Sequence, residues 1–261
     1  MALGMLGLRR LRTMRLVPLV LLAAMPLPVS AAPADVVAAV SAKERPAAAR
    51  EMDASRRPAE VLRFLGLRRG DRALDLFSVG GYYAEVMARA VGPNGVVLAW
   101  EPTNFYDEAA RENWAALQRR APNARVLVAT AAELALAPES FDFAMLHLNY
   151  HDTYWESAEF GLPRMDPEAF LARLHAALKP GGVVGVVDHV ADPGGDVREV
   201  ADRLHRIDPA VIRADFERAG FVLDGESDLL RNPADDHGKL VFDPAVRGKT
   251  DRVLYRFRKP G

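Results

Sequence analysis

Short apolar runs alternate with helix-like segments through most of this chain. Seven runs rich in β-branched, aliphatic or aromatic residues follow residue 70, and helical periodicity or capping signals separate most of them. This alternation predicts a parallel sheet with helices on both faces, because parallel neighbours need a crossover connection. We expect strands at 72–77, 96–100, 125–129, 141–148, 183–187, 221–227 and 252–257, and helices at 82–91, 105–120, 166–178 and 209–219.

The composition is that of a globular protein and excludes several classes. The chain has 261 residues, of which 50% are hydrophobic, and this length can bury a sizeable core. A formal net charge of -1 argues against a dedicated nucleic-acid binder, which would normally carry a strongly basic face. The absence of cysteine excludes disulfides, thiolate metal sites and a cysteine nucleophile.

Residues 1–31 have the pattern of a signal peptide. They contain four arginines and no acidic residue, followed by an apolar run at 16–27 and small residues at 29–32. The apolar run is interrupted by prolines and is too short to span a bilayer comfortably. We expect cleavage after Ala31 and a mature protein in the periplasm or secreted, without stable membrane insertion. An uncleaved membrane anchor is the alternative.

Residues 32–70 are expected to form an N-terminal helical cap that precedes the main domain at 71–261. The segment is rich in alanine and has valines and leucines at helical spacing. Pro46 and Pro58 divide it into shorter pieces, and each proline suits a first helical turn.

The ends of the first two expected strands carry residues suited to a nucleoside. Asp75 lies near the end of the first strand, the turn Gly80-Gly81-Tyr82 leads into the next helix, and Glu101 ends the second strand. In open α/β sheets, ligands bind beyond the carboxyl ends of the strands. Glycines let the backbone approach a ligand, and a carboxylate can bind ribose hydroxyls. The alternative is a tight turn with no ligand and a solvated glutamate.

The loop distinguishes between two classes of cofactor. A dinucleotide site requires G-x-G-x-x-G after the first strand, and the two adjacent glycines here do not match it. S-adenosylmethionine fits better because it has no pyrophosphate and has a cationic amino-acid moiety, which favours an acidic neighbour such as Asp75.

Several blocks resemble a known enzyme class. The stretch Leu74–Glu101, the pair Phe141-Asp142 and the block Leu178–Gly182 resemble a class I S-adenosylmethionine-dependent methyltransferase. More narrowly, a bacterial family of exported, uncharacterised methyltransferases is similar in the blocks 80–85, 149–152, 187–189, 204–208 and 247–252. The resemblance implies an α/β, three-layer, doubly wound sheet of seven mostly parallel strands with the last strand antiparallel. It also implies that Asp75, Gly80, Gly81, Tyr82 and Glu101 bind S-adenosylmethionine, and it does not identify a substrate.

Two residues depart from the pattern of the class. Phe77 and Val79 stand where the class usually has glycine, and a Cβ at either position would crowd the methionine end of the cofactor. The alternative to an enzyme is therefore a non-catalytic module on the same fold, which binds a small ligand through a degenerate cofactor loop.

A second group of candidates follows the fourth and fifth strands. His151 and Asp152 follow strand four, and Asp188 and His189 end strand five. Strands one, four and five are neighbours in this topology, so these side chains should converge. Methyl transfer requires an aligned acceptor and a group that takes its proton. We expect His151 to be that base, Asp152 to orient it or the substrate, and His189 to be the second candidate, with a small molecule as acceptor.

The remaining histidines and a metal site have weaker support. His147 lies within an apolar run and is expected to be a core histidine with a satisfied ring. His205 is either a substrate contact or a solvated helix residue. A metal-assisted enzyme that uses Asp152, Asp188 and the histidines is a third alternative, but no compact ligand motif such as H-E-x-x-H supports it, so no metal is expected. The oligomeric state is not predicted.

Overall fold

The structure is a computed structural model that describes Met1 and residues 32–261. The expected signal peptide at 1–31 therefore lies outside the described residues. Among the helices that the structure does describe, none combines the length and apolar character needed to cross a bilayer.

One seven-stranded sheet organises residues 71–261. The strand order is β3-β2-β1-β4-β5-β7-β6, and β7 alone runs antiparallel to its neighbours. This confirms the expected mostly parallel sheet with an antiparallel last strand. The strands are β1 (Arg72–Leu76), β2 (Val96–Pro102), β3 (Ala124–Ala129), β4 (Phe141–His147), β5 (Leu178–His189), β6 (Val222–Glu226) and β7 (Arg252–Arg258).

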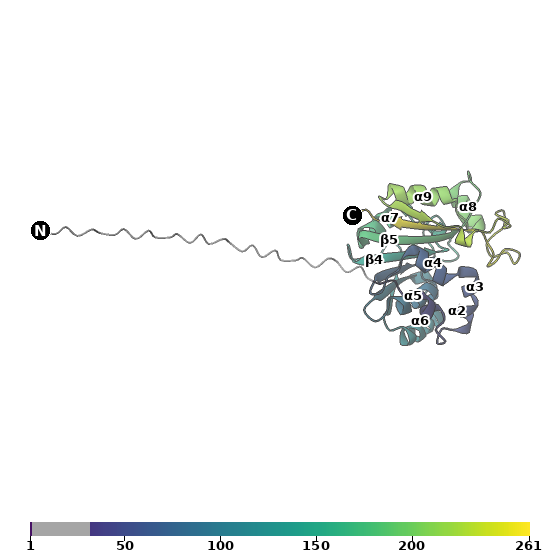
Figure 1. The fold of residues 1–261 in the computed structure, drawn as a ribbon. Helices are drawn as coiled ribbons and strands as arrows, with labels where there is room; N and C mark the ends of the chain where they lie inside the picture. Colours follow the sequence, from purple (N-terminus) through teal and green to yellow (C-terminus); the bar gives the residue numbers. More distant parts are fainter. Residues whose placement is uncertain (2–31) are drawn as a thin grey trace. The chain divides into compact units, whose positions relative to one another are not determined.

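Helices cover both faces of the sheet and make three layers (Figure 1). One face packs against α1 (Val36–Val40), α4 (Pro58–Leu65), α5 (Tyr82–Val91) and α6 (Glu108–Arg120). The other face packs against α7 (Pro167–Ala177) and α9 (Pro209–Arg218). Buried residues alternate between the two cores along the strands, as in β1, where Ala73 faces the first core and Leu74 the second. The remaining short elements are α2 (Ala47–Glu51), α3 (Asp53–Arg56), α8 (Val197–Leu204), η1 (Thr103–Phe105), η2 (His151–Thr153) and η3 (Asp228–Leu230).

Five of the described α-helices begin at an aspartate that accepts backbone N–H groups: Asp35 caps α1, and the other four helices follow β2. Asp107, Asp166, Asp196 and Asp208 cap α6, α7, α8 and α9 in this way. Helices α6, α7 and α9 were expected from their periodicity. Helix α8 was not, because half of its eight residues are charged and its apolar stripe, although regularly spaced, is short.

The N-terminal segment and β5 differ in detail from the expected elements. Residues 36–65 form four short helices, and Pro58 opens α4 as expected, but α1 and α4 bury Val36, Val61 and Leu62 in the main core. Strand β5 begins at Leu178, so the Lys179–Gly182 block belongs to the strand and not to a turn. The pairing between β4 and β5 absorbs this block with a shift in register after Phe141.

Candidate functional site

A cavity of about 820 Å³ opens beyond the carboxyl ends of β1, β4 and β5. Its size is within the range of small-molecule sites, and its position is the one where doubly wound sheets bind ligands. Residues from seven parts of the chain line it, including Arg56, Asp75, Tyr82, His147, His151, Asp152, His189, His205 and Phe242. Of the residues predicted to bind the cofactor, Asp75 and Tyr82 line this cavity, whereas Gly80, Gly81 and Glu101 do not.

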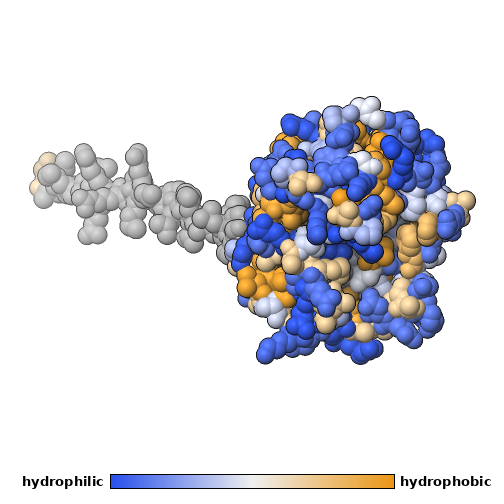
Figure 2. All heavy atoms as spheres, turned by 90° about the vertical axis from the view of Figure 1, so that its right-hand side faces the viewer, coloured by the Kyte–Doolittle hydropathy of each residue, from blue (hydrophilic) through white to orange (hydrophobic). Residues whose placement is uncertain are grey.

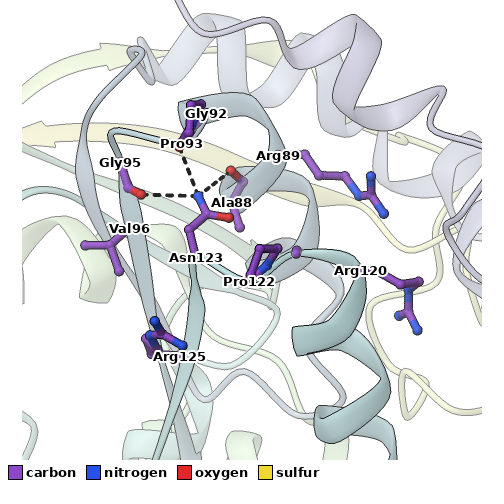
Figure 3. A pocket seen from close by; sticks show the side chains of 11 residues that line it. Ala88, Arg89, Gly92, Pro93, Gly95, Val96, Arg120, Pro122, Asn123 and Arg125 are labelled. Carbon is purple, nitrogen blue, oxygen red and sulfur yellow. Dashed lines mark hydrogen bonds between the residues drawn. The ribbon is translucent and has the colours of Figure 1, made fainter.

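A second hollow, of about 600 Å³, lies at the opposite edge of the sheet (Figure 3). It is formed where β2 and β3 begin, which is not where ligands bind in this architecture. Figure 3 shows Asn123 directed at its neighbours, and its Nδ2 donates to the carbonyls of Ala88, Gly92 and Gly95 at 2.8, 3.1 and 3.2 Å. The amide N–H groups of Asn123 therefore link β3 to the end of α5 and the turn after it, and they are not available to a ligand.

Two groups of opposite charge lie at one end of the 820 Å³ cavity. Asp75 is buried and accepts a hydrogen bond from the Ser78 hydroxyl. Burial raises the pKa of Asp75 to about 7, although Ser78 and the positive charge of Arg56 oppose the rise. Arg56 ends α3, stacks over the Tyr82 ring at 4.3 Å and forms no ion pair or side-chain hydrogen bond within residues 32–261. The end of the cavity thus holds a carboxyl group and an unpaired guanidinium.

Three buried polar atoms of the cavity lining have no hydrogen-bond partner among the described residues. They are the Tyr83 hydroxyl, His147 Nε2 and Asn149 Oδ1. The expectation that His147 is a core histidine with a satisfied ring was wrong, because the ring lies against Tyr83 at 4.6 Å and Nε2 has no partner. Unmade hydrogen bonds are costly when buried, so a ligand that supplies them would bind more tightly.

The two non-glycine residues of the loop do not obstruct the cavity in the expected way. Phe77 has a φ of 52°, so the backbone keeps the left-handed conformation that glycine would adopt there. Its ring turns into the core and contacts Trp100 and Phe170, with centroids 4.3 and 5.8 Å away. Val79 is 59% exposed. The loop therefore accommodates both side chains without a clash.

Glu101 does not reach the cavity. Its side chain is completely buried, and Oε2 accepts a hydrogen bond from Trp114 Nε1 at 3.0 Å. Burial raises the pKa of Glu101 to about 7. Oε1 has no partner among the described residues, so the carboxyl group retains capacity for one more hydrogen bond. A ribose in the cavity would therefore reach Glu101 only after Trp114 or the loop at 78–81 moves.

The close contact of Gly81 with α6 provides a stability test of this loop. A Cβ on Gly81 would lie 2.5 Å from Leu117 Cδ1 and 3.1 Å from Trp114, at a φ of 73°. Gly81→Ala is therefore expected to lower the free energy of unfolding by about 2 kcal/mol or more, measured by urea denaturation. Gly80→Ala is the matched control, because its φ is 80° and nothing lies within 4 Å of the added carbon. Equal losses in the two variants would show that the contact with α6 is unimportant.

Histidines and aspartates from β4, β5 and α8 form another wall of the cavity. His151 Nδ1 lies 2.8 Å from Oδ1 of the fully buried Asp188, and Nε2 lies 3.3 Å from Asp152 Oδ1. Burial alone would lower the pKa of His151, but the two carboxylates outweigh it and raise the pKa to about 9. His151 is therefore protonated at neutral pH.

His189 has the opposite electrostatic environment. Its Nδ1 lies 2.7 Å from the Thr250 hydroxyl, and no carboxylate is paired with its ring among the described residues. Burial lowers the pKa of His189 well below its usual value, and the nearby charges of His151 and Arg252 add to the effect. The structure thus brings together His151, Asp152 and His189, as expected, and makes His189 the neutral member.

Sequence reasoning missed Arg56 and did not decide the role of His205. Arg56 lies in a polar stretch of the N-terminal segment, and no pattern there indicates a ligand. His205 was left between two roles, and the structure places its ring in the cavity lining between Trp155 and Phe242.

Comparisons with known proteins agree with this geometry. Residues 74–186 match a family model described as "Methyltransferase domain". Demethylmenaquinone methyltransferases from strains of Staphylococcus aureus are 28% identical over 125 residues, which span 48% of this chain and 45% of theirs. The chain thus matches about half the length of these curated relatives.

Solved structures of low sequence identity share the fold. A SAM-dependent methyltransferase from Aquifex aeolicus has a TM-score of 0.55 at 18% identity and covers 77% of this chain and 88% of its own. A 1,6-didemethyltoxoflavin-N1-methyltransferase from Burkholderia thailandensis, with S-adenosylhomocysteine bound, has a TM-score of 0.50 at 19% identity and covers 82% and 79%. With the strand order above, these likenesses show that the chain has the fold of these S-adenosylmethionine-dependent methyltransferases, and residues 74–186 are similar to the methyltransferase domain.

Proposed function

We propose that the protein transfers a methyl group from S-adenosylmethionine to a small, partly apolar molecule in the 820 Å³ cavity. The observation that carries the proposal is the pair of opposite charges at the end of the cavity beside β1. The amino-acid moiety of S-adenosylmethionine has a carboxylate and an ammonium group. Arg56 would bind the carboxylate and Asp75 the ammonium, so each would gain an ion-pair partner that it lacks within residues 32–261.

The histidine wall would serve the acceptor. When bound, S-adenosylmethionine supplies a methyl group activated by its sulfonium. The acceptor must lose a proton as it takes the methyl group, and we assign this proton to Nε2 of the neutral His189. In the tautomer whose Nδ1–H donates to the Thr250 hydroxyl, Nε2 keeps its lone pair. His151, held by Asp188, would then orient the acceptor rather than deprotonate it.

The rim of the cavity supports a partly apolar acceptor. Val79, Phe160, Leu240 and Phe242 are large apolar side chains that are exposed, and all four line the cavity. Figure 2 views the side on which α3 and α8 lie in Figure 1, and apolar groups there are scattered among hydrophilic ones. A cluster of four exposed apolar residues around one opening is therefore unusual on this surface, and it would cover an apolar ligand.

Calorimetric titration of the purified protein with S-adenosylmethionine, and then with S-adenosylhomocysteine, tests the proposal. We expect micromolar binding of both. Binding that is weakened by Asp75→Asn would support the assignment of the charged end, and an acceptor screen with His189→Gln as the inactive control would follow. Failure of the folded protein to bind either compound would contradict the proposal.

The raised pKa of Asp75 predicts that affinity for S-adenosylmethionine depends on pH. Below pH 7 the carboxyl group is increasingly protonated, and a neutral carboxyl group attracts the ammonium group less. Affinity should therefore fall by about 15-fold in all as the pH decreases from 7 to 5.5, measured by calorimetry. Asp75→Asn, which has no proton to lose there, should bind more weakly and show no such slope. A constant affinity of the wild type across this range would contradict the assignment.

The enclosure of Glu101 favours a second candidate, a binding module without catalysis. If Trp114 and the loop at 78–81 do not move, the ribose subsite is closed, and the cavity takes another small zwitterionic ligand. Turnover distinguishes the two candidates: an enzyme loses turnover in His189→Gln and keeps its ligand affinity, whereas a binding module has no turnover to lose.

Export to the periplasm is a further part of the proposal, as is membership of the narrower exported family. It is supported by the arginines, the apolar run and the small residues of 1–31. Cell fractionation of the producing bacterium tests it, with the N-terminus of the recovered protein sequenced. Recovery from the periplasm with an N-terminus at Ala32 is expected, and recovery only from the cytoplasm would contradict it.

A further inference from the structure

We propose that His151, Asp152 and His205 form a binding site for one divalent transition-metal ion in the wall of the cavity. One ring nitrogen of His151, a carboxylate oxygen of Asp152 and one ring nitrogen of His205 all lie within 4.8 Å of one another. Asp152 Oδ1 is 3.3 Å from His151 Nε2 and 3.7 Å from His205 Nδ1. Ligand atoms around a tetrahedral zinc ion are about 3.4 Å apart, so small movements suffice to place an ion between these three.

The donor set indicates the class of ion. Two imidazole nitrogens and one carboxylate oxygen suit zinc, cobalt, manganese or iron, whereas magnesium and calcium prefer oxygen ligands throughout. Three protein ligands also leave at least one coordination position open. Because His151, Asp152 and His205 all line the cavity, the open position would face the space available to a small molecule.

A buried carboxylate orients the first ligand. Asp188 is completely buried. Its Oδ2 accepts a hydrogen bond from the backbone N–H of His151 at 2.8 Å, and its Oδ1 lies 2.8 Å from His151 Nδ1. This arrangement leaves Nε2 as the nitrogen directed at Asp152. Histidine ligands of metals commonly make this kind of contact to a carboxylate through their second nitrogen, which fixes the ring and increases its basicity.

The backbone and two aromatic rings hold the third ligand. His205 follows α8 with φ 50° and ψ 49°, a left-handed conformation that costs a residue other than glycine free energy. Its ring lies between Trp155 and Phe242, with centroids 4.6 and 5.1 Å away. Glycine would adopt the left-handed conformation at this helix end more easily than histidine does. The strained turn and the two rings instead hold the His205 imidazole in the lining of the cavity.

The competing explanation is a network without metal, in which a protonated His151 pairs with both carboxylates. The two explanations differ in what a metal titration shows. The metal site also does not depend on methyl transfer, since none of its three ligands belongs to the pair Arg56 and Asp75 assigned to the cofactor. Its test can therefore fail or succeed independently of S-adenosylmethionine binding.

Titration of the chelator-treated, dialysed protein with Co²⁺ tests the site. We expect one ion per chain, with visible absorption bands of Co²⁺ in a site of low symmetry, and displacement of Co²⁺ by Zn²⁺ with loss of these bands. Asp152→Asn and His205→Ala should each weaken Co²⁺ binding at least tenfold. Asp188→Asn should weaken it by about tenfold through the orientation of His151.

His175→Gln is the matched control, because His175 packs against Phe221 and does not line the cavity. Circular dichroism verifies that each variant is folded, and Asp152 is partly exposed, so its replacement is the mildest of the three. Absence of stoichiometric binding by the wild type would overturn the proposal. Equal Co²⁺ affinity in the wild type, Asp152→Asn and His205→Ala would overturn it as well.

Discussion

Replacement of Arg56 by glutamine is expected to weaken S-adenosylmethionine binding about 100-fold while leaving the protein folded. The guanidinium is partly buried and has no carboxylate partner within residues 32–261, so the folded protein does not need its charge. A bound carboxylate would be its first ion-pair partner. Removal of one member of a desolvated, hydrogen-bonded charge pair costs 2–5 kcal/mol, and 100-fold corresponds to about 2.7 kcal/mol.

Calorimetry with the wild type, Arg56→Gln and Arg56→Lys measures this effect. The lysine variant should recover part of the affinity, because it keeps the charge but not the two-pronged geometry of the guanidinium. Arg213→Gln is the control, since Arg213 pairs with Glu217 on the exposed face of α9, away from the cavity. If Arg56→Gln binds S-adenosylmethionine as tightly as the wild type, the carboxylate is held elsewhere and the assignment of the charged end is wrong.

Replacement of Arg206 by leucine is expected to lower the free energy of unfolding by about 3–5 kcal/mol. Arg206 and Asp235 have fully buried side chains and form a two-pronged ion pair at 2.7 and 3.2 Å. Arg206 also donates to the carbonyls of Val190 and Lys239 at 3.0 and 2.9 Å. Without the guanidinium, the Asp235 carboxylate stays buried with no opposite charge, and two carbonyls lose their donors.

Urea denaturation of three variants separates the charge effect from the loss of packing. Arg206→Leu with Asp235→Leu should be less destabilised than Arg206→Leu alone, because the double variant leaves no unpaired carboxylate. Arg213→Leu is the matched control for an exposed arginine–carboxylate pair and should leave the free energy of unfolding nearly unchanged. A double variant that is less stable than the single one would show that the packing of the side chains, and not the buried charge, dominates.

The Arg206 pair also affects the cavity. It anchors the segment around Asp235 and Lys239 to the end of β5, and this segment continues into Leu240 and Phe242 at the rim. A weakened anchor would loosen that rim. Ligand affinity in Arg206→Leu should therefore fall together with stability, in contrast to Arg56→Gln, which should lose affinity alone.

Periodicity and end signals were sufficient to predict the sheet. The strands are short apolar runs bounded by glycine, proline or acidic residues. Each run favours a strand through its own residues, so it can be recognised without knowledge of its neighbours in space. Helix α8 and the start of β5 were not predicted. Helix α8 has only eight residues, half of them charged, so the helical spacing of Val197, Val200 and Leu204 is a short signal. Lys179–Gly182 has the local composition of a turn until neighbouring strands pair with it.

The candidate site was predicted only in part. Topology determines which strand ends lie side by side, but it does not determine which of their side chains are exposed to the cavity. Asp75, His151, Asp152 and His189 meet at the cavity, since the carboxyl ends of neighbouring parallel strands share one edge of the sheet. Glu101 is at the predicted end of β2, yet Trp114 of α6 encloses it. No property of Glu101 or its sequence neighbours indicates which side chain a helix thirteen residues later will place over it.

The class of fold, the order of its elements and the strand ends that carry reactive side chains follow from periodicity and chain connectivity, so they can be predicted from the sequence. The charge states and the partners of those side chains follow only from the folded structure. Two histidines at neighbouring strand ends differ in protonation because one faces two carboxylates and the other a hydroxyl. Such differences in protonation depend on burial and on contacts between distant segments. The position of Arg56 and His205 in the lining of the same cavity depends on such contacts too.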